Sequence, residues 1–346
     1  MIIQLLPAAG HGVRLELQSD GTAAADDCAA RLAADFAAWP GNEAPSEELP
    51  RAVLALSARP FASGDKRLPA RLFRTRMCEA RGTGPERLVR YDDASAAVLD
   101  ASDPFALSVG IQAADAELLY EIAYNATLSV VGELFDAQGL HRVHALGFRA
   151  HGRNALCVFD EGGGKSTLAM ALRRERAGQA TFFSDETPLL TRKGMAPHPN
   201  RLALAAAAVK PFGAELAGQG RPFPRRLFPE KLLYPWAAGE IASPGPVDAI
   251  FVDGGRDFDE AAFEECGRER ALAALTRSMV VGLGVAQMAE YLLRFDPPHL
   301  LRLARIAASR AATAFSIARS SRAFVFRRTP NPAANAAALL DFLSTF

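Results

Sequence analysis

The segment from Ala155 to Leu172 carries a glycine-rich turn and a lysine between an apolar run and an amphipathic helix pattern, and its centre reads Gly162-Gly163-Gly164-Lys165-Ser166-Thr167. Backbone amides of such a turn, together with the helix N-terminus, form a concave anion site. A lysine there reaches the β- and γ-phosphates of a nucleotide, and the next hydroxyl binds Mg²⁺. The pattern therefore predicts a nucleotide site. The alternative is a glycine turn that only caps a helix and leaves Lys165 in solvent.

Two residues depart from the full phosphate-loop pattern. Phe159 stands where the pattern has its first glycine, and Glu161 places an acid inside the loop. An acid there would repel phosphate unless its side chain points outward. Because of these departures, a second interpretation stays open, in which the protein binds a nucleotide but has lost its catalytic activity.

A second group of polar residues follows the loop helix. Thr181–Thr187 reads as a strand that ends in Asp185 and Glu186. Such acids could hold Mg²⁺ or accept a proton from an attacking hydroxyl, and the alternative is an ordinary charged turn. Neighbouring strand residues point to opposite faces, so we expect one of the two acids to face the phosphates. His144 stands on a predicted strand before the loop strand, either near this chemistry or as a buried structural histidine.

Together these residues resemble the HPr kinase/phosphorylase superfamily, in particular the HPr-kinase-related proteins that share only its catalytic core. The motifs that carry the resemblance are Val143-His144-Ala145, the glycine-lysine loop and Ser184-Asp185-Glu186. They cover about residues 140–210. The resemblance implies an α/β fold with a mixed sheet, like that of phosphoenolpyruvate carboxykinases, and Mg²⁺-dependent phosphoryl transfer from ATP to a hydroxyl.

The resemblance also implies roles for individual residues. Residues 162–167 would bind ATP, with Lys165 on its β- and γ-phosphates, and Ser166, Asp185 and Glu186 would hold Mg²⁺. Asp185 would be the metal-linked acid or the general base, and His144 would lie near the transferred phosphoryl group. The glycine-rich signature that follows the core in HPr kinases has no counterpart in Pro197–Phe212. We therefore expect an acceptor other than HPr, either a serine of a ribosomal peptide such as a lasso precursor or a small hydroxyl compound.

The elements that must position these residues divide into two predicted domains, an α+β domain at 1–136 and the phosphate-loop domain at 137–346. In the first, residues 40–69 are rich in Pro, Gly and Ser and predict loops between short elements, and Ala113–Phe135 has helical periodicity. In the second, strands are predicted at 143–148, 155–159, 181–183, 189–191, 247–252 and 323–327. Helices are predicted at 166–174 and 332–343 and over most of 260–320.

Two basic segments in the second domain have open roles. Arg221–Lys231 belongs to a proline-rich stretch and is either a mobile loop that closes over ATP or an acidic peptide, or a solvated loop. Eight arginines at 294–328 recur along predicted helices, which favours a solvated helix face. Lys210 is either a phosphate contact or a surface lysine.

Composition excludes several classes of protein. The 346 residues include 39 basic and 39 acidic side chains and are 49% apolar, which disfavours a nucleic-acid or membrane-surface protein and a disordered chain. Four scattered cysteines build no zinc or redox motif. The absence of a signal-peptide pattern predicts a cytoplasmic protein, and a homo-oligomer stays open. A nucleotide hydrolase that drives motion is disfavoured, because no arginine-finger arrangement is recognisable.

Overall fold

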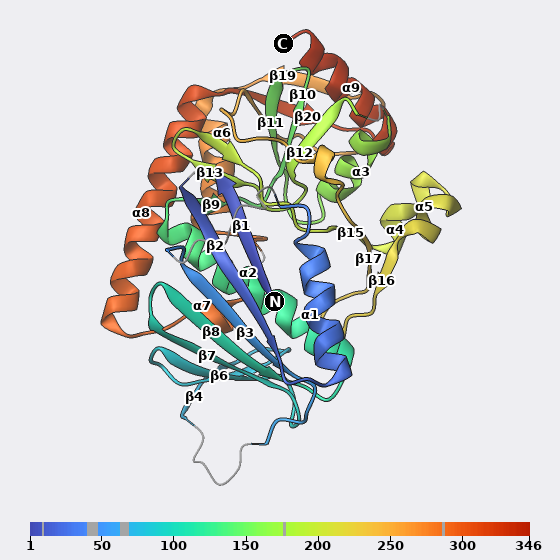
Figure 1. The fold of residues 1–346 in the computed structure, drawn as a ribbon. Coiled ribbons are helices and arrows are strands. Elements are labelled where there is room, and N and C mark those ends of the chain that lie inside the picture. The colour runs from blue at the N-terminus through green and yellow to red at the C-terminus, as the bar shows by residue number, and fades with distance from the viewer. Residues whose placement is uncertain (9, 40–47, 63–68, 176–177, 286–287) are drawn as a thin grey trace.

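The computed structural model describes residues 1–8, 10–39, 48–62, 69–175, 178–285 and 288–346. An eight-stranded sheet forms the lower half of the molecule in Figure 1, in the order β1-β2-β3-β8-β7-β6-β5-β4. Its strands are β1 (Ile2–Ala8), β2 (His11–Ser19), β3 (Arg51–Ser57), β4 (Arg71–Arg74), β5 (Glu79–Arg81), β6 (Glu86–Arg90), β7 (Ala96–Asp103) and β8 (Ala106–Gln112). Neighbouring strands are antiparallel except that β2, β3 and β8 run parallel to one another.

Two helices, α1 (Ala23–Asp35) and α2 (Ala116–Ala137), pack on one face of this sheet. Asp115 caps α2 by accepting hydrogen bonds from the amides of Glu117 and Leu118. The helix follows the periodicity predicted for Ala113–Phe135, and it is buried almost throughout. The domain boundary predicted after residue 136 falls in the last turn of this helix and stays a prediction.

The central strand β3 lies inside residues 40–69, for which the sequence predicts loops between short elements, and Arg51–Ser57 is such an element. Ala52, Leu54 and Leu56 are buried, and the residues between them are not, which is the alternation of a sheet with one covered face. Prolines on both sides hide this short run in the sequence. Residues 40–47 and 63–68 of the predicted loop lie outside the described residues.

A six-stranded mixed sheet forms the upper half, in the order β12-β10-β11-β18-β20-β19. Its strands are β10 (Leu146–Ala150), β11 (Arg153–Val158), β12 (Ala180–Ser184), β18 (Ala249–Asp253), β19 (Ala262–Glu265) and β20 (Arg322–Arg327). Three of them, β11, β18 and β20, are parallel neighbours, and the others pair antiparallel. The predicted α/β class with a mixed sheet is confirmed. Residues 260–320 are mainly helical, as predicted, and also contain the short strand β19.

Helices cover both faces of the six-stranded sheet. Ala155 and Cys157 of β11 pack toward α3 (Lys165–Glu175) and α9 (Pro332–Ser344), whereas Leu156 and Val158 pack toward α6 (Arg268–Leu275) and α8 (Pro297–Ser320). Asn331 caps α9 as its sequence predicts, accepting from the amides of residues 333 and 334. The strand-loop-helix unit from β11 to α3 is therefore held from both sides.

Two small three-stranded sheets lie beside the six-stranded sheet. One contains β9 (His141–Arg142), β13 (Leu189–Thr191) and β14 (Gly194–Ala196), and the other contains β15 (Leu202–Leu204), β16 (Arg221–Phe223) and β17 (Lys231–Tyr234). The remaining short helices are α4 (Ala206–Val209), α5 (Ala214–Gln219) and α7 (Ala289–Leu292), with 3₁₀ turns at Lys210–Phe212 and Ala238–Glu240 and a π-helical turn at Thr276–Val280.

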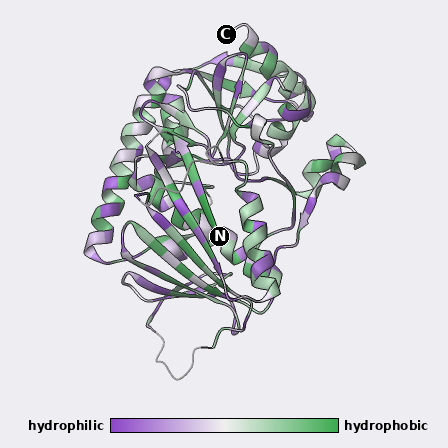
Figure 2. Cartoon of the chain, viewed as in Figure 1, coloured by the Kyte–Doolittle hydropathy of each residue, from purple (hydrophilic) through white to green (hydrophobic). Residues whose placement is uncertain are grey.

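Ion pairs join the two halves, and arginines of both basic segments take part in them. Arginines of the C-terminal part of the chain bind acids of α2: Arg294 pairs with Glu133 at 2.6 Å, and Arg310 pairs with Asp136, all four side chains being buried. Figure 2 shows hydrophilic and hydrophobic segments alternating along α8, so one of its faces is available for such packing. The prediction of a solvated face for 294–328 is wrong at these arginines, because a buried guanidinium needs a buried acid.

The arginines of the segment from Arg221 to Lys231 are also tied to the N-terminal helices. Arg221 pairs with Asp35 at 2.9 Å, Arg225 with Glu121 at 3.1 Å and Arg226 with Asp115 at 3.0 Å. These contacts fasten the segment to α1 and α2. A segment held by these ion pairs is not free to close over ATP as a mobile loop would. Lys210 is exposed.

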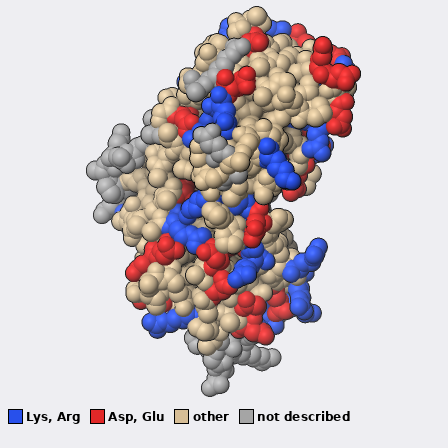
Figure 3. Space-filling view, turned by 90° about the vertical axis from the view of Figure 1, so that its right-hand side faces the viewer, with Lys and Arg blue, Asp and Glu red and all other residues tan. Residues whose placement is uncertain are grey.

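Charges of both signs share the surface. On the face shown in Figure 3, basic and acidic side chains lie next to one another, in keeping with the zero net charge of the chain. Among the described residues, no helix combines the length and the apolar character that crossing a bilayer requires. The cytoplasmic location stays a prediction.

Acid is expected to destabilise this fold through His198. Its ring is buried, shares hydrogen bonds with Thr187 and Asn200 through Nδ1, and packs edge-on against Trp39. Burial, followed by the nearby Arg142 charge, lowers the pKa of His198 to about 3. The folded protein thus leaves His198 neutral while the unfolded chain protonates it below pH 6.5, so stability should fall by about 1.4 kcal/mol per pH unit between pH 6.5 and 3.

Chemical unfolding of wild-type protein and His198→Gln at pH 6.5 and pH 5 checks this. Between pH 6.5 and pH 5, the free energy of unfolding of the variant should fall by about 2 kcal/mol less than that of the wild type. The exposed His151 adopts a positive φ of 50°, which asparagine tolerates, so His151→Asn is the matched control and should behave as wild type. An equal pH response of His198→Gln and wild type would contradict the argument.

Candidate functional site

The glycine loop connects the end of β11 at Val158 to the start of α3 at Lys165. Gly162 and Gly164 have φ values of 72° and 81°, which residues with a Cβ rarely adopt. A Cβ on Gly163 would lie 2.8 Å from the Asp160 carbonyl oxygen and 2.9 Å from the Cβ of Phe159. All three glycines are therefore required by the tight path of the chain. The first amides of α3, which have no partner inside the helix, face this loop.

The two departures from the phosphate-loop pattern do not fill the loop with side chains. Phe159 is 2% exposed and packs in the core on Phe326, with ring centroids 6.1 Å apart. Glu161 is exposed. Phe159 therefore packs in the core beneath the loop, and Glu161 can remain hydrated.

Lys165 is buried, and its ammonium closes over the loop. The Nζ atom donates to the carbonyl oxygens of Phe159 and Asp160, each at 2.9 Å. Burial, aided by the charge of Arg328, lowers the pKa of Lys165 to about 8, although Glu186 and Asp160 oppose this shift. The loop therefore holds a cation at its mouth, where the sequence predicts the phosphate-binding lysine.

Ser166 and Asp185 meet although they come from different elements. The Ser166 hydroxyl, in the first turn of α3, donates to Asp185 Oδ2 at 2.9 Å, just after the end of β12. Asp185 is 3% exposed, and burial together with the neighbouring charge of Glu186 raises its pKa to about 7, against the opposing effects of Ser166 and Lys231. Asp185 is the acid nearer the loop hydroxyl, whereas Glu186 lines a separate small cavity.

His144 lies close to this site, but not on a strand. It precedes β10, and its amide donates to the Ser278 carbonyl at 3.2 Å. Both ring nitrogens are buried without a hydrogen-bond partner in the described part of the chain, and the ring packs against the backbone of Gly284. Burial and the charge of Lys165 lower its pKa to about 4. The imidazole is thus a neutral group beside the lysine. The prediction that residues 143–145 are a strand is wrong, because β10 begins at Leu146.

Three arginines bind the glycine loop, and one of them, Arg328, belongs to the segment 294–328 for which the sequence predicts a solvated face, although it is buried. Buried Arg328 donates to the Gly163 carbonyl and to Asp253 Oδ1 at 2.6 Å, and its guanidinium lies 3.9 Å from the centroid of the Phe159 ring. Arg277 pairs with Asp160, and Arg256 donates to the Gly162 carbonyl at 3.3 Å. The sequence signal for this group is Asp253, the acid at the end of the strand before Gly254. The arginines themselves lie far from the loop in the sequence, so no local pattern connects them to it.

A cavity of about 560 Å³ adjoins the loop at the carboxyl ends of β11 and β18. Its lining combines apolar and charged side chains: Val158, Asp160, Val252, Asp253, Gly255, Arg270, Ala273, Ala274 and Arg277. Ligands of open α/β sheets bind in such crevices beyond the carboxyl ends of parallel strands. The volume lies in the range of small-molecule sites.

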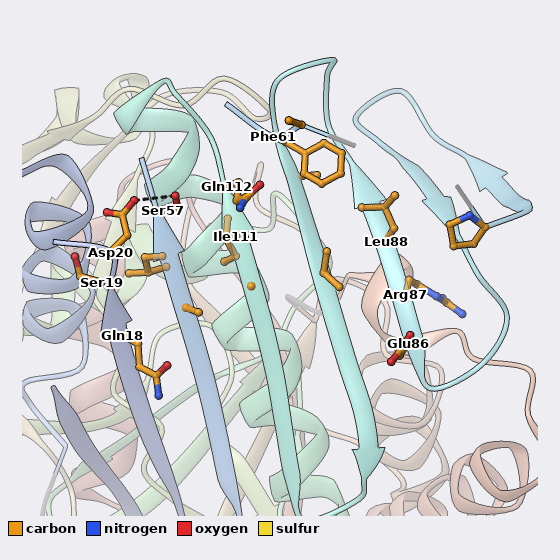
Figure 4. Close-up of a pocket in the computed structure, with 17 residues that line it drawn as sticks. Gln18, Ser19, Asp20, Ser57, Phe61, Glu86, Arg87, Leu88, Ile111 and Gln112 are labelled. Carbon is orange, nitrogen blue, oxygen red and sulfur yellow. Dashed lines mark hydrogen bonds between the residues drawn. The ribbon is translucent and has the colours of Figure 1, made fainter. Parts of the chain in front are cut away.

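A larger cavity, about 740 Å³, lies on the N-terminal sheet away from the loop. Figure 4 shows Asp20, Ser57 and Gln112 together at one end of it, with the hydroxyl of Ser57 donating to Asp20 at 2.8 Å. Its floor consists of small and apolar residues such as Ala55 and Gly110. The described residues that line it include no lysine or histidine, so its chemistry is unlike that of the glycine loop.

Metal-binding side chains are few around the loop. No group of three or more His, Cys, Asp or Glu residues in the described part of the chain is arranged to hold a metal ion by itself. Mg²⁺ in phosphoryl-transfer sites is bound by one or two carboxylates together with substrate phosphates. Ser166 and Asp185, which are hydrogen-bonded to each other, match that smaller set, whereas the third predicted ligand, Glu186, lines the separate cavity. A scan against family models and a search of curated proteins gave no match to this chain.

Proposed function

We propose that this protein transfers a phosphoryl group from ATP to a serine or other hydroxyl, in the manner of the HPr-kinase-related proteins that it resembles. The observation that carries the proposal is the hydrogen bond of 2.9 Å from Ser166 to Asp185. It joins the phosphate loop to a buried acid from the next strand. A phosphate site and a group able to accept a proton are the two parts that transfer to a hydroxyl requires.

The loop residues support binding of the triphosphate. Lys165 already donates to two loop carbonyls, and phosphate oxygens are stronger acceptors for the same ammonium. Gly162, Gly163 and Gly164 keep the backbone open to close approach, and Ser166 and Asp185 would hold Mg²⁺. When bound, Mg²⁺ would neutralise charge on the transferring group. The cavity beside β18 has room for the nucleoside.

The transfer itself needs one proton acceptor. The acceptor oxygen forms a bond to the γ-phosphorus as the bond from that phosphorus to the β,γ-bridging oxygen breaks, and ADP leaves with the electron pair. The hydroxyl proton passes to Asp185. Lys165 stabilises the transferring phosphoryl group, and neutral His144 can donate a hydrogen bond to it without adding charge.

Binding of ATP with Mg²⁺, measured by calorimetry, tests the loop assignment. Lys165→Met keeps the length of the side chain and removes its charge, so affinity should fall by about 100-fold. Lys193→Met changes an exposed lysine in the same way and should bind as wild type. Unchanged affinity of Lys165→Met would contradict the assignment.

Transfer from labelled ATP to serine peptides and small hydroxyl compounds then separates the candidate functions. Binding with transfer supports a kinase. Tight binding without transfer to any acceptor supports the alternative, a nucleotide-binding regulatory protein. Phe159 and Glu161, which depart from the loop pattern, are the reason for considering it. No binding of ATP at all rejects both.

A further inference from the structure

A small cavity of about 70 Å³ lies next to Glu186, between α2 and the sheet of β15, β16 and β17. Its lining residues come from both halves of the molecule: Tyr124, Asn125, Leu128, Glu186, Arg201, Ala203, Phe223, Arg225 and Lys231. One water occupies about 30 Å³ in the liquid, so the cavity admits a group of only a few heavy atoms. Three of its side chains are cationic and one is acidic.

The cations of this cavity are not equally engaged. Arg201 is bound to Asp35 and to the hydroxyl of Tyr120, so its charge is compensated. Arg225 donates from Nε to Glu121 at 3.1 Å, and within the described residues nothing accepts from its two terminal nitrogens. The ammonium of Lys231 forms no hydrogen bond or ion pair with any described residue. Lys231 and Arg225 both line the cavity, whose one acidic lining residue is Glu186, while Glu121 pairs with Arg225 from outside the lining.

The same lysine lies near the reacting groups. Its charge lowers the pKa of Asp185 and of His144. Glu186, which lines the cavity, directly follows Asp185. A group held in the cavity would therefore lie beside the acid that we propose as the proton acceptor.

We propose that this cavity binds a carboxylate that the acceptor carries close to its hydroxyl, with Lys231 and Arg225 as its ligands. The ammonium of Lys231 and the terminal nitrogens of Arg225 have no acceptor among the described residues, which favours a group with two acceptor oxygens, and the volume favours a carboxylate over a larger group. The role of the bound molecule as acceptor rests on the proposed function. Tyr124, Asn125 and Leu128 of α2 form one wall, so the N-terminal half contributes to acceptor selection. Glu121, also on α2, forms an ion pair with Arg225 and so holds the Arg225 side chain in place.

Two matched pairs of short peptides test this. The first pair is Gly-Ala-Ser with a free C-terminal carboxylate or with a C-terminal amide, and the second is acetyl-Ser-Asp-amide or acetyl-Ser-Asn-amide. Binding is measured by NMR titration and transfer is measured with ATP and Mg²⁺. For wild type, the anionic member of at least one pair should bind about tenfold tighter than its neutral counterpart. The pair that shows the preference identifies a terminal or a side-chain carboxylate as the source.

Variants assign the preference to the cavity. Lys231→Gln, which leaves no partner unpaired, should remove the preference, and Lys231→Arg should retain it. Lys210→Gln changes an exposed lysine of the same region and should match wild type. Equal binding of anionic and neutral peptides by wild type, or a preference that survives in Lys231→Gln, would overturn the proposal.

The two proposals fail separately in this experiment. An anion preference that depends on Lys231, with no ATP binding and no transfer, would uphold the cavity as a carboxylate site and reject the kinase. Transfer to the anionic and neutral peptides at equal rates would uphold the kinase and reject the carboxylate site.

Discussion

Replacing Asp185 by asparagine is expected to lower phosphoryl transfer by about 10³-fold and to leave ATP binding within a few-fold of wild type. The amide can still accept the hydrogen bond from Ser166, so the loop keeps its geometry, but it cannot take the proton of the acceptor hydroxyl. In the absence of nucleotide and Mg²⁺, the variant should also be more stable at neutral pH by about 1–2 kcal/mol, because burial and Glu186 disfavour the ionised side chain.

Rates of transfer at saturating ATP and unfolding curves without ligand measure the two effects. Asp257→Asn is the matched control, since Asp257 is exposed beyond β18 and should change neither quantity. A variant that transfers phosphoryl groups at the wild-type rate would remove Asp185 from the mechanism. A variant that loses activity together with its folded structure would instead show that the acid is needed to build the site.

Local sequence predicts the phosphate loop because its parts are contiguous. The apolar strand, the glycines, Lys165 and the helix follow one another, so the geometry is encoded within one stretch of chain. The acid at the end of the next strand is also predicted, since the turn after β12 brings it back to α3. Likeness of the whole core to phosphoenolpyruvate carboxykinases stays a prediction.

The rest of the site depends on contacts between distant segments, which periodicity does not contain. Arg328 follows a strand more than 150 residues after Gly163, yet the two are hydrogen-bonded. Arg294 and Arg310 belong to the segment for which the sequence predicts a solvated face, and they are buried because α2 supplies Glu133 and Asp136. Lys231 and α2 share a cavity for the same reason. When the ion-pair partner of a charged residue lies on another element, the local sequence predicts that the residue is exposed to solvent.

The glycine at 132 is expected to be one of the most sensitive positions of the fold. Gly132→Ala should destabilise the protein by about 3–5 kcal/mol, although alanine normally favours a helix over glycine by about 1 kcal/mol. A Cβ on this residue of α2 would overlap the guanidinium of Arg142. That side chain is flexible in principle, but here it is 1% exposed and donates from Nη1 to the Leu128 carbonyl at 2.6 Å. It can therefore move only by breaking buried contacts.

Chemical unfolding of the single and double variants separates this overlap from a general intolerance of α2. In an Arg142→Ala background the guanidinium is gone, so adding Gly132→Ala should cost less than about 1 kcal/mol. Gly218→Ala places the same change in α5, where a Cβ meets no atom within 4 Å, and should alter stability by less than about 1 kcal/mol. Full additivity of the two substitutions would contradict the argument, because independent sites add and residues in contact do not.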